Sequence, residues 1–102
     1  MAISLGHLKI DTPVFLAPMT GITDVPFRRL ARDLGGELMF SEMVASRELL
    51  RKTNRSVRMI ERDSATGIHA VQLAGRDPEM MAEAARLNEA SGADVIDINM
   101  GC

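Results

Sequence analysis

The sequence of 102 residues has little of several residue types, with one cysteine, no tryptophan and no tyrosine. A single cysteine excludes an internal disulfide framework and favours a reducing compartment. No apolar run approaches the roughly 18 residues of a membrane-spanning helix, and no secretory signal pattern opens the chain. A net charge of −2 excludes a global basic field. We therefore expect one cytoplasmic globular unit without a membrane partner.

Motifs for metal binding and nucleotide hydrolysis are also absent. The chain has no CxxC, no HExxH and no Walker loop, so no metal site is indicated. His7 and His69 are isolated, and neither has a recognisable spacing from Cys102. This gives little support to a hydrolase with a cysteine–histidine pair.

Apolar runs alternate with amphipathic segments along the whole chain. Asp24 and Asp77 are each followed within two residues by a proline, which predicts capped helices over 25–34 and 78–90. Residues 8–10 and 13–16 flank a turn, which predicts a short hairpin. The other expected elements are strands over 14–17, 38–42, 68–73 and 94–98. The segment over 46–61 is helix-compatible, either as one helix or as two divided at Thr53-Asn54.

This order of strands and helices predicts an α/β fold with a parallel sheet and right-handed crossovers. About four strands and three helices make the first half of a (β/α)8 TIM barrel, or else a small open sheet. The last expected strand has no helix after it, which would leave an apolar strand uncovered. We therefore expect residues 1–102 to be the N-terminal half of a barrel domain in a longer protein.

Polar and turn-forming residues gather where the expected strands end. Pro18 and Gly21 suit a tight turn that brings backbone amides close to a flat ligand, although an ordinary loop has the same composition. Gln72 lies in an apolar strand, so its amide needs either a neighbouring strand or a ring with carbonyl and N–H groups. Asp97 and Asn99 share one strand face, with Asp97 one layer deeper, where a structural carboxylate is the simpler interpretation.

Cys102 follows a glycine turn beyond the last strand, a position that favours exposure to a cleft, although buried free cysteines are usually inert. Arginines also recur at three- and four-residue steps over 47–62. On one helix they would form either a solvated face or a phosphate-binding stripe. These arginines are Arg47, Arg51, Arg55, Arg58 and Arg62.

Four strand-end motifs, in order, resemble those of the tRNA-dihydrouridine synthases. They are LAPMTGITDVPFR over residues 16–28, SEM over 41–43, VQLAG over 71–75 and DINMGC over 97–102. The last motif is most similar to the bacterial B-type branch. Shorter fragments of these motifs occur in other flavin barrels, so the order of all four carries the resemblance.

The resemblance implies an FMN-dependent (β/α)8 barrel with a helical tRNA-binding domain, reduced by NADPH and acting on tRNA. By position, Pro18, Met19 and Thr20 would line the FMN, and Gln72 would contact its ring. Asn99 would hold the uracil, and Cys102 would give a proton to C5 while hydride reaches C6. The segments that would hold the FMN phosphate and the RNA lie beyond position 102 in the family, so residues 1–102 alone are expected to be inactive.

Two other functions remain open at this point. One is a flavin barrel that acts on a free pyrimidine, like the dihydroorotate or dihydropyrimidine dehydrogenases. The other is a non-enzymatic half-barrel that pairs with another chain through exposed strand edges.

Overall fold

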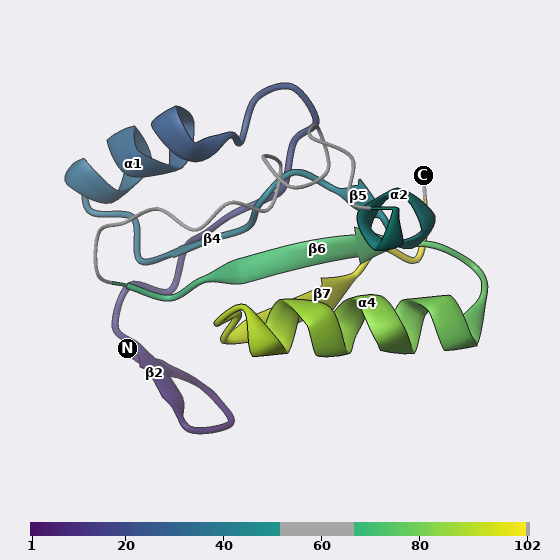
Figure 1. Ribbon diagram of the computed structural model, residues 1–102. Helices are drawn as coiled ribbons and strands as arrows, with labels where there is room; N and C mark the ends of the chain where they lie inside the picture. Colours follow the sequence, from purple (N-terminus) through teal and green to yellow (C-terminus); the bar gives the residue numbers. More distant parts are fainter. Residues whose placement is uncertain (52–66, 102) are drawn as a thin grey trace.

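The computed structural model describes residues 1–51 and 67–101 (Figure 1). Lys52, Arg55, Arg58, Arg62 and Cys102 lie outside the described residues. The elements, in chain order, are β1 (Ile3–Leu5), β2 (Leu8–Ile10), β3 (Phe15–Leu16), α1 (Val25–Asp33), β4 (Leu38–Met39), β5 (Val44–Ala45), α2 (Ser46–Leu50), β6 (Ala70–Ala74), α4 (Pro78–Ala90) and β7 (Val95–Ile98). None of the described helices is long and apolar enough to cross a bilayer.

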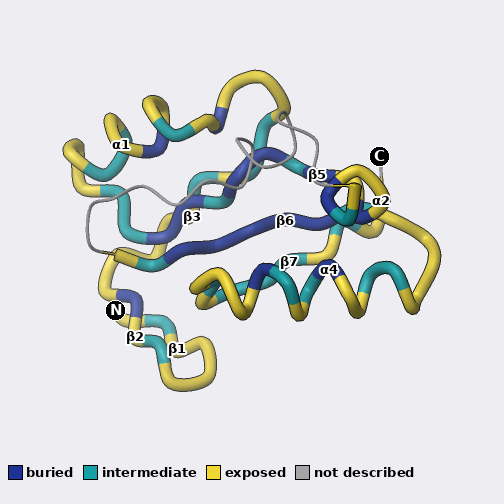
Figure 2. Tube along the Cα trace, viewed as in Figure 1, coloured by how far each residue is buried: buried dark blue, intermediate teal, exposed yellow. Residues whose placement is uncertain are grey.

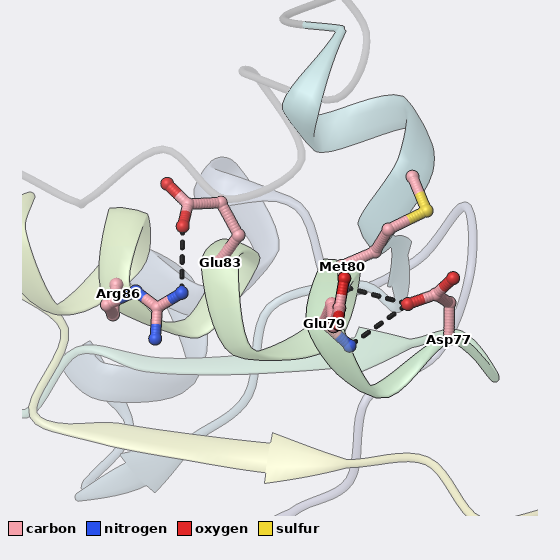
Figure 3. A network of polar contacts seen from close by, with 5 residues as sticks. All are labelled: Asp77, Glu79, Met80, Glu83 and Arg86. Carbon is pink, nitrogen blue, oxygen red and sulfur yellow. Dashed lines mark hydrogen bonds and ion pairs between the residues drawn. The ribbon is translucent and has the colours of Figure 1, made fainter.

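Both helices with predicted caps form as the sequence indicates. The Asp24 side chain accepts a hydrogen bond from the Phe27 N–H at 3.0 Å and begins α1. Asp77 accepts from the N–H groups of Glu79 and Met80 and begins α4 (Figure 3). Each cap satisfies backbone donors that a helix start leaves without an intrahelical partner.

The sheet pairings after the first hairpin are parallel. β3 pairs with β4, and β6 lies between β5 and β7 in a three-stranded sheet. A bridge between Phe40 and Ala70 connects the two sheets. The described residues therefore form an α/β arrangement of parallel strands and helices, and over these ranges the strands close no barrel.

The predicted hairpin is wrong in its pairing. Residues 8–10 pair antiparallel with β1, in the register Ile3 to Ile10, and not with residues 13–16. The turn between β1 and β2 contains Gly6 at φ +57°, a conformation that favours glycine. β3 instead aligns with the buried residues Leu38 and Met39, so burial of β4 decides its partner.

Several expected boundaries also change. β3 and β4 are two residues long, and β6 begins at Ala70 rather than at position 68. Of the helix-compatible segment over 46–61, the first part forms α2 (Ser46–Leu50), and positions 52–61 lie outside the described residues. The sequence did not predict β5, because its two residues precede a helix directly and show no alternation.

β6 is buried on both faces and organises the core (Figure 2). Val71 and Leu73 lie in one apolar cluster with Ala84 of α4, which runs along β6 and β7 in Figure 1. Ala70 lies in a second cluster with Ile10 and Leu38. Since successive strand side chains alternate between faces, Gln72 shares the face of Ala70, away from α4.

Candidate active site

The polar side chains that follow the parallel strands contact one another at the carboxyl edge of the sheet. Gln72 of β6 donates from Nε2 to Oδ2 of Asp97 in β7 at 2.6 Å. Asn99, just beyond β7, lies with its Nδ2 3.4 Å from Oε1 of Gln72 and 3.2 Å from Sδ of Met43. The second, third and fourth sequence motifs therefore meet at one place.

The Gln72 amide is oriented by β7. Gln72 is 8 % exposed, and it is the register partner of Asp97 in the parallel pair of β6 and β7. The sequence left two partners open for this amide, a neighbouring strand or a ring with carbonyl and N–H groups. The structure shows the bond to the neighbouring strand and places the amide beside the other strand-end motifs. Among the described residues no second acceptor receives a hydrogen bond from Nε2, so one N–H of this amide remains available to a ligand.

Asp97 is a hydrogen-bonded carboxylate within the sheet, as the simpler interpretation of the sequence predicts. An ionised carboxylate accepts hydrogen bonds only. It therefore selects the orientation of Gln72 that directs Nε2 toward β7 and leaves Oε1 facing Asn99. Asp97 acts on the site through Gln72.

Asn99 stabilises the turn that leads toward Cys102. Its Oδ1 accepts a hydrogen bond from the Gly101 N–H at 3.0 Å, and its own N–H donates to the Leu73 carbonyl at 2.9 Å. This side-chain-to-backbone bond two residues on is the pattern of an Asx turn. The Nδ2 contacts with the Met43 thioether and the distant Gln72 amide oxygen are both weaker than a bond to a well-placed carbonyl.

The first strand-end motif forms a closed turn. The Met19 carbonyl accepts from the N–H groups of Ile22 and Thr23, and the buried Thr23 hydroxyl bonds both the N–H and the carbonyl of Met19. Gly21 has φ +76°, as its place in the turn predicts. Arg28 is 4 % exposed and donates to the Thr23 carbonyl at 2.6 Å, which fixes the turn to α1.

This turn presents Pro18, Met19 and Thr20 together. Pro18 and Met19 are half-buried, and Thr20 is exposed. Within the described residues the Thr20 N–H and hydroxyl make no hydrogen bond, so both can serve a ligand. The turn thus offers an apolar surface with polar groups at one side.

Glu42 is a site residue that sequence reasoning did not single out. It is 8 % exposed, and its Oε1 accepts a hydrogen bond from the Gly21 N–H at 2.5 Å. This contact joins the first and second motifs. The available signal was a carboxylate at the end of an apolar strand, because such a group needs a partner when it is buried.

Replacing Glu42 with alanine is expected to release the turn at Gly21. Hydrogen bonds to charged groups contribute about 1.5–3 kcal/mol, so amide exchange at Gly21 should become roughly 10- to 150-fold faster. Hydrogen exchange followed residue by residue measures this effect. Glu42→Gln keeps an acceptor and should show a smaller change, and Glu89→Ala, on the exposed face of α4, should show none. Unchanged exchange in Glu42→Ala would contradict the assignment.

The predicted proton donor and most of the arginine series lie outside the described residues. Cys102 is outside the described residues, and so are three of the five arginines; Arg47 and Arg51 are described and exposed. Across residues 1–51 and 67–101, no group of three or more His, Cys, Asp or Glu could hold a metal ion.

Comparison with known proteins gives consistent results. The family model described as "Dihydrouridine synthase (Dus)" matches residues 15–102. A "Probable tRNA-dihydrouridine synthase" of Rhodobacter capsulatus is 50% identical over 100% of this chain and 32% of its own length. The "tRNA-dihydrouridine synthase B" of Pasteurella multocida is 46% identical over 96% of this chain and 30% of its own length. The chain thus spans about a third or less of the curated relatives it matches.

Proposed function

This chain belongs to the dihydrouridine synthase family, and we propose that it forms part of an enzyme that reduces uridine in tRNA to 5,6-dihydrouridine. The names of its relatives support the substrate and the product. We further propose that residues 1–102 are the N-terminal half of an FMN-binding (β/α)8 barrel in a cytoplasmic protein. The remaining barrel strands and a helical tRNA-binding domain would come from the rest of a protein with the length of these relatives.

The observation that carries the proposal is the contact network among the four motifs. Glu42 bonds the Gly21 turn, Met43 contacts Asn99, and Gln72 binds both Asp97 and Asn99. Active sites of parallel barrels form at the carboxyl ends of strands, from residues of several strands. The four motifs, one at the end of each strand, therefore contribute side chains to a single site and do not form four separate loops.

The described residues fit an isoalloxazine ring. Such a ring is flat and apolar on its faces and carries carbonyl and N–H groups at its edge. The turn of Pro18 and Met19 supplies an apolar surface, while Thr20 and the remaining N–H of Gln72 supply polar groups without described partners. FMN, reduced by NADPH, would supply the hydride that C6 of uracil accepts.

Asn99 and Cys102 would act on the uracil. Uracil has an edge of carbonyl and N–H groups, and Asn99 presents both an acceptor and a donor. Its Nδ2 can exchange the weak contacts with Met43 and Gln72 for a uracil carbonyl. We assign to the Cys102 thiol the proton that C5 receives as C6 receives hydride, so that the C5–C6 double bond becomes a single bond. A positive protein surface would hold the RNA while the base leaves its stack.

Reconstitution of the full-length protein tests this function. With FMN, NADPH and tRNA that lacks modifications, we expect one or more uridines to gain two hydrogens, which mass spectrometry of nuclease digests measures. NADPH oxidation should match the dihydrouridine formed. Free uracil and uridine serve as the matched substrates, because they have the same ring without an RNA chain. Reduction of the free pyrimidines in preference to tRNA would contradict the proposal and favour a pyrimidine dehydrogenase.

A further inference from the structure

A cleft of about 240 Å³ lies at the carboxyl ends of β5 and β6, beside the start of α4. Its lining comes from the start of α2, which follows β5 directly, and from the segment that joins β6 to α4. The lining residues are Ala45, Ser46, Arg47, Ala74, Gly75, Arg76, Asp77 and Met80. The cleft opens at the same edge of the sheet as the Gln72 and Asn99 side chains, and Ala74 follows Gln72 by two residues on β6.

The two arginines occupy matching positions after the two strands. Ala45 and Ala74 are register partners in the parallel pair of β5 and β6, and each is followed two residues later by an arginine. Neighbouring strands lie about 4.8 Å apart. Arg47 and Arg76 are therefore brought to one place by the sheet, although 29 positions separate them in the sequence.

The packing beneath the cleft fixes this arrangement. A Cβ atom at Gly75 would overlap Oγ of Ser46 and lie 2.7 Å from Sδ of Met81. Ser46 is itself 3 % exposed. The ends of β6, α2 and α4 are thus in close contact, so the backbones that carry Arg47 and Arg76 cannot move apart without loss of buried contacts.

Neither arginine is neutralised by the described part of the chain. No hydrogen bond or ion pair joins the Arg47 or Arg76 side chain to a described residue. Among the described residues that line the cleft, Asp77 is the one carboxylate, and its Oδ1 accepts from the N–H groups of Glu79 and Met80 (Figure 3). Two adjacent guanidinium groups repel each other, and an anion between them removes that repulsion.

We propose that Arg47 and Arg76 together bind one phosphodiester group of the RNA substrate in this cleft. The guanidinium group presents planar N–H donors that match phosphate oxygens. Two such groups, one from the first turn of α2 and one from the segment between β6 and α4, position a phosphate more firmly than one. The proposal rests on the proposed function, since it names where the RNA chain crosses the mouth of the site.

Binding of tRNA by the full-length protein tests the proposal. Arg47→Ala and Arg76→Ala should each weaken tRNA binding by about tenfold, since each removes charge-assisted hydrogen bonds. The slope of log K against log salt should fall by about 0.7–0.9, the value for one phosphate. The double variant should bind little more weakly than the single variants, because both side chains hold the same group.

Arg86→Ala is the matched control. Arg86 is an exposed arginine of α4, outside the cleft, and its Nη2 lies 2.9 Å from Oε2 of Glu83 (Figure 3). This variant removes the same charge and should keep the wild-type affinity and salt slope. Unfolding midpoints in urea identify any variant that has lost its fold. Because both cleft arginines are exposed, we expect neither substitution to shift the midpoint.

Three results would overturn the proposal. Affinities of the cleft variants equal to that of Arg86→Ala would remove the arginines from RNA binding. Losses that multiply in the double variant, with a slope change of two phosphates, would mean two separate contacts. A raised KM for NADPH with unchanged tRNA affinity would place a coenzyme phosphate in the cleft. Absence of dihydrouridine formation by the wild-type protein is a different result, which contradicts the proposed function itself.

Discussion

Replacing Cys102 with alanine is expected to lower the rate of uridine reduction by about 10²- to 10⁴-fold, the usual contribution of a general acid. A cysteine thiol in water has a pKa of about 8.5, so it carries its proton at neutral pH. The Asx turn of Asn99 and Gly101 holds the backbone directly before this residue. Alanine has no proton to give, and water would have to supply it to C5.

Two half-reactions separate this role from a structural one. Reduction of the flavin by NADPH, followed by its absorbance under anaerobic conditions, should persist in Cys102→Ala. Oxidation of the reduced flavin by tRNA in a single turnover should be slow. Cys102→Ser keeps a hydroxyl, a much weaker acid than a thiol, and should also be slow. Single-turnover oxidation at the wild-type rate in either variant would remove Cys102 from the proton transfer.

Replacing Leu73 with alanine is expected to lower the free energy of unfolding by about 2–5 kcal/mol. Leu73 is 0 % exposed and lies in the apolar cluster that joins β6 to α4. Its truncation leaves a cavity between a strand and a helix that are both fixed by other contacts, so little collapse can refill it. Against a typical domain stability of about 5–15 kcal/mol this is a large fraction. Urea denaturation followed by circular dichroism measures the change.

Two companion variants keep this result interpretable. Leu73→Met conserves most of the volume and should lose less than about 1.5 kcal/mol. Leu30→Ala truncates a leucine that is 56% exposed on α1 and should change stability by no more than about 0.5 kcal/mol. A loss in Leu73→Ala as small as that in Leu30→Ala would mean that the β6–α4 contact does not hold the fold.

The sequence predicted best those parts of the fold that depend on interactions between residues close together in the chain. The aspartate-proline starts of α1 and α4 act within one helical turn, and both helices form where predicted. The last strand is bounded by Gly92 and by polar Asn99, and β7 spans most of the expected range. The convergence of Gln72 with Asp97 and Asn99 was also accessible, because parallel strands bring their carboxyl ends to one edge.

The predictions that were wrong or missing depend on contacts between residues far apart in the sequence. The choice of partner for residues 8–10 depends on which other strand pairs with residues 15–16, and that is decided by the burial of Leu38 and Met39 across the chain. The contact of Glu42 with the Gly21 N–H joins positions 21 residues apart, so no spacing rule identifies it. The two arginines of the cleft share no motif, because strand register alone brings them together.

The central position of β6 also sets the order in which the fold can become stable as the ribosome makes the chain. β3 and β4 are synthesised early, but the bridge from Phe40 and the contacts of Leu38 need Ala70, which emerges about thirty residues later. Residues 70–98 then form a compact strand–helix–strand unit with pairings 25 positions apart. The loop that this unit closes is shorter than the one closed by the bridge from Phe40 to Ala70, which spans 30 positions, so its closure costs slightly less entropy. The earlier half of the chain can therefore complete its core contacts only after β6, the strand that carries Gln72, has been synthesised.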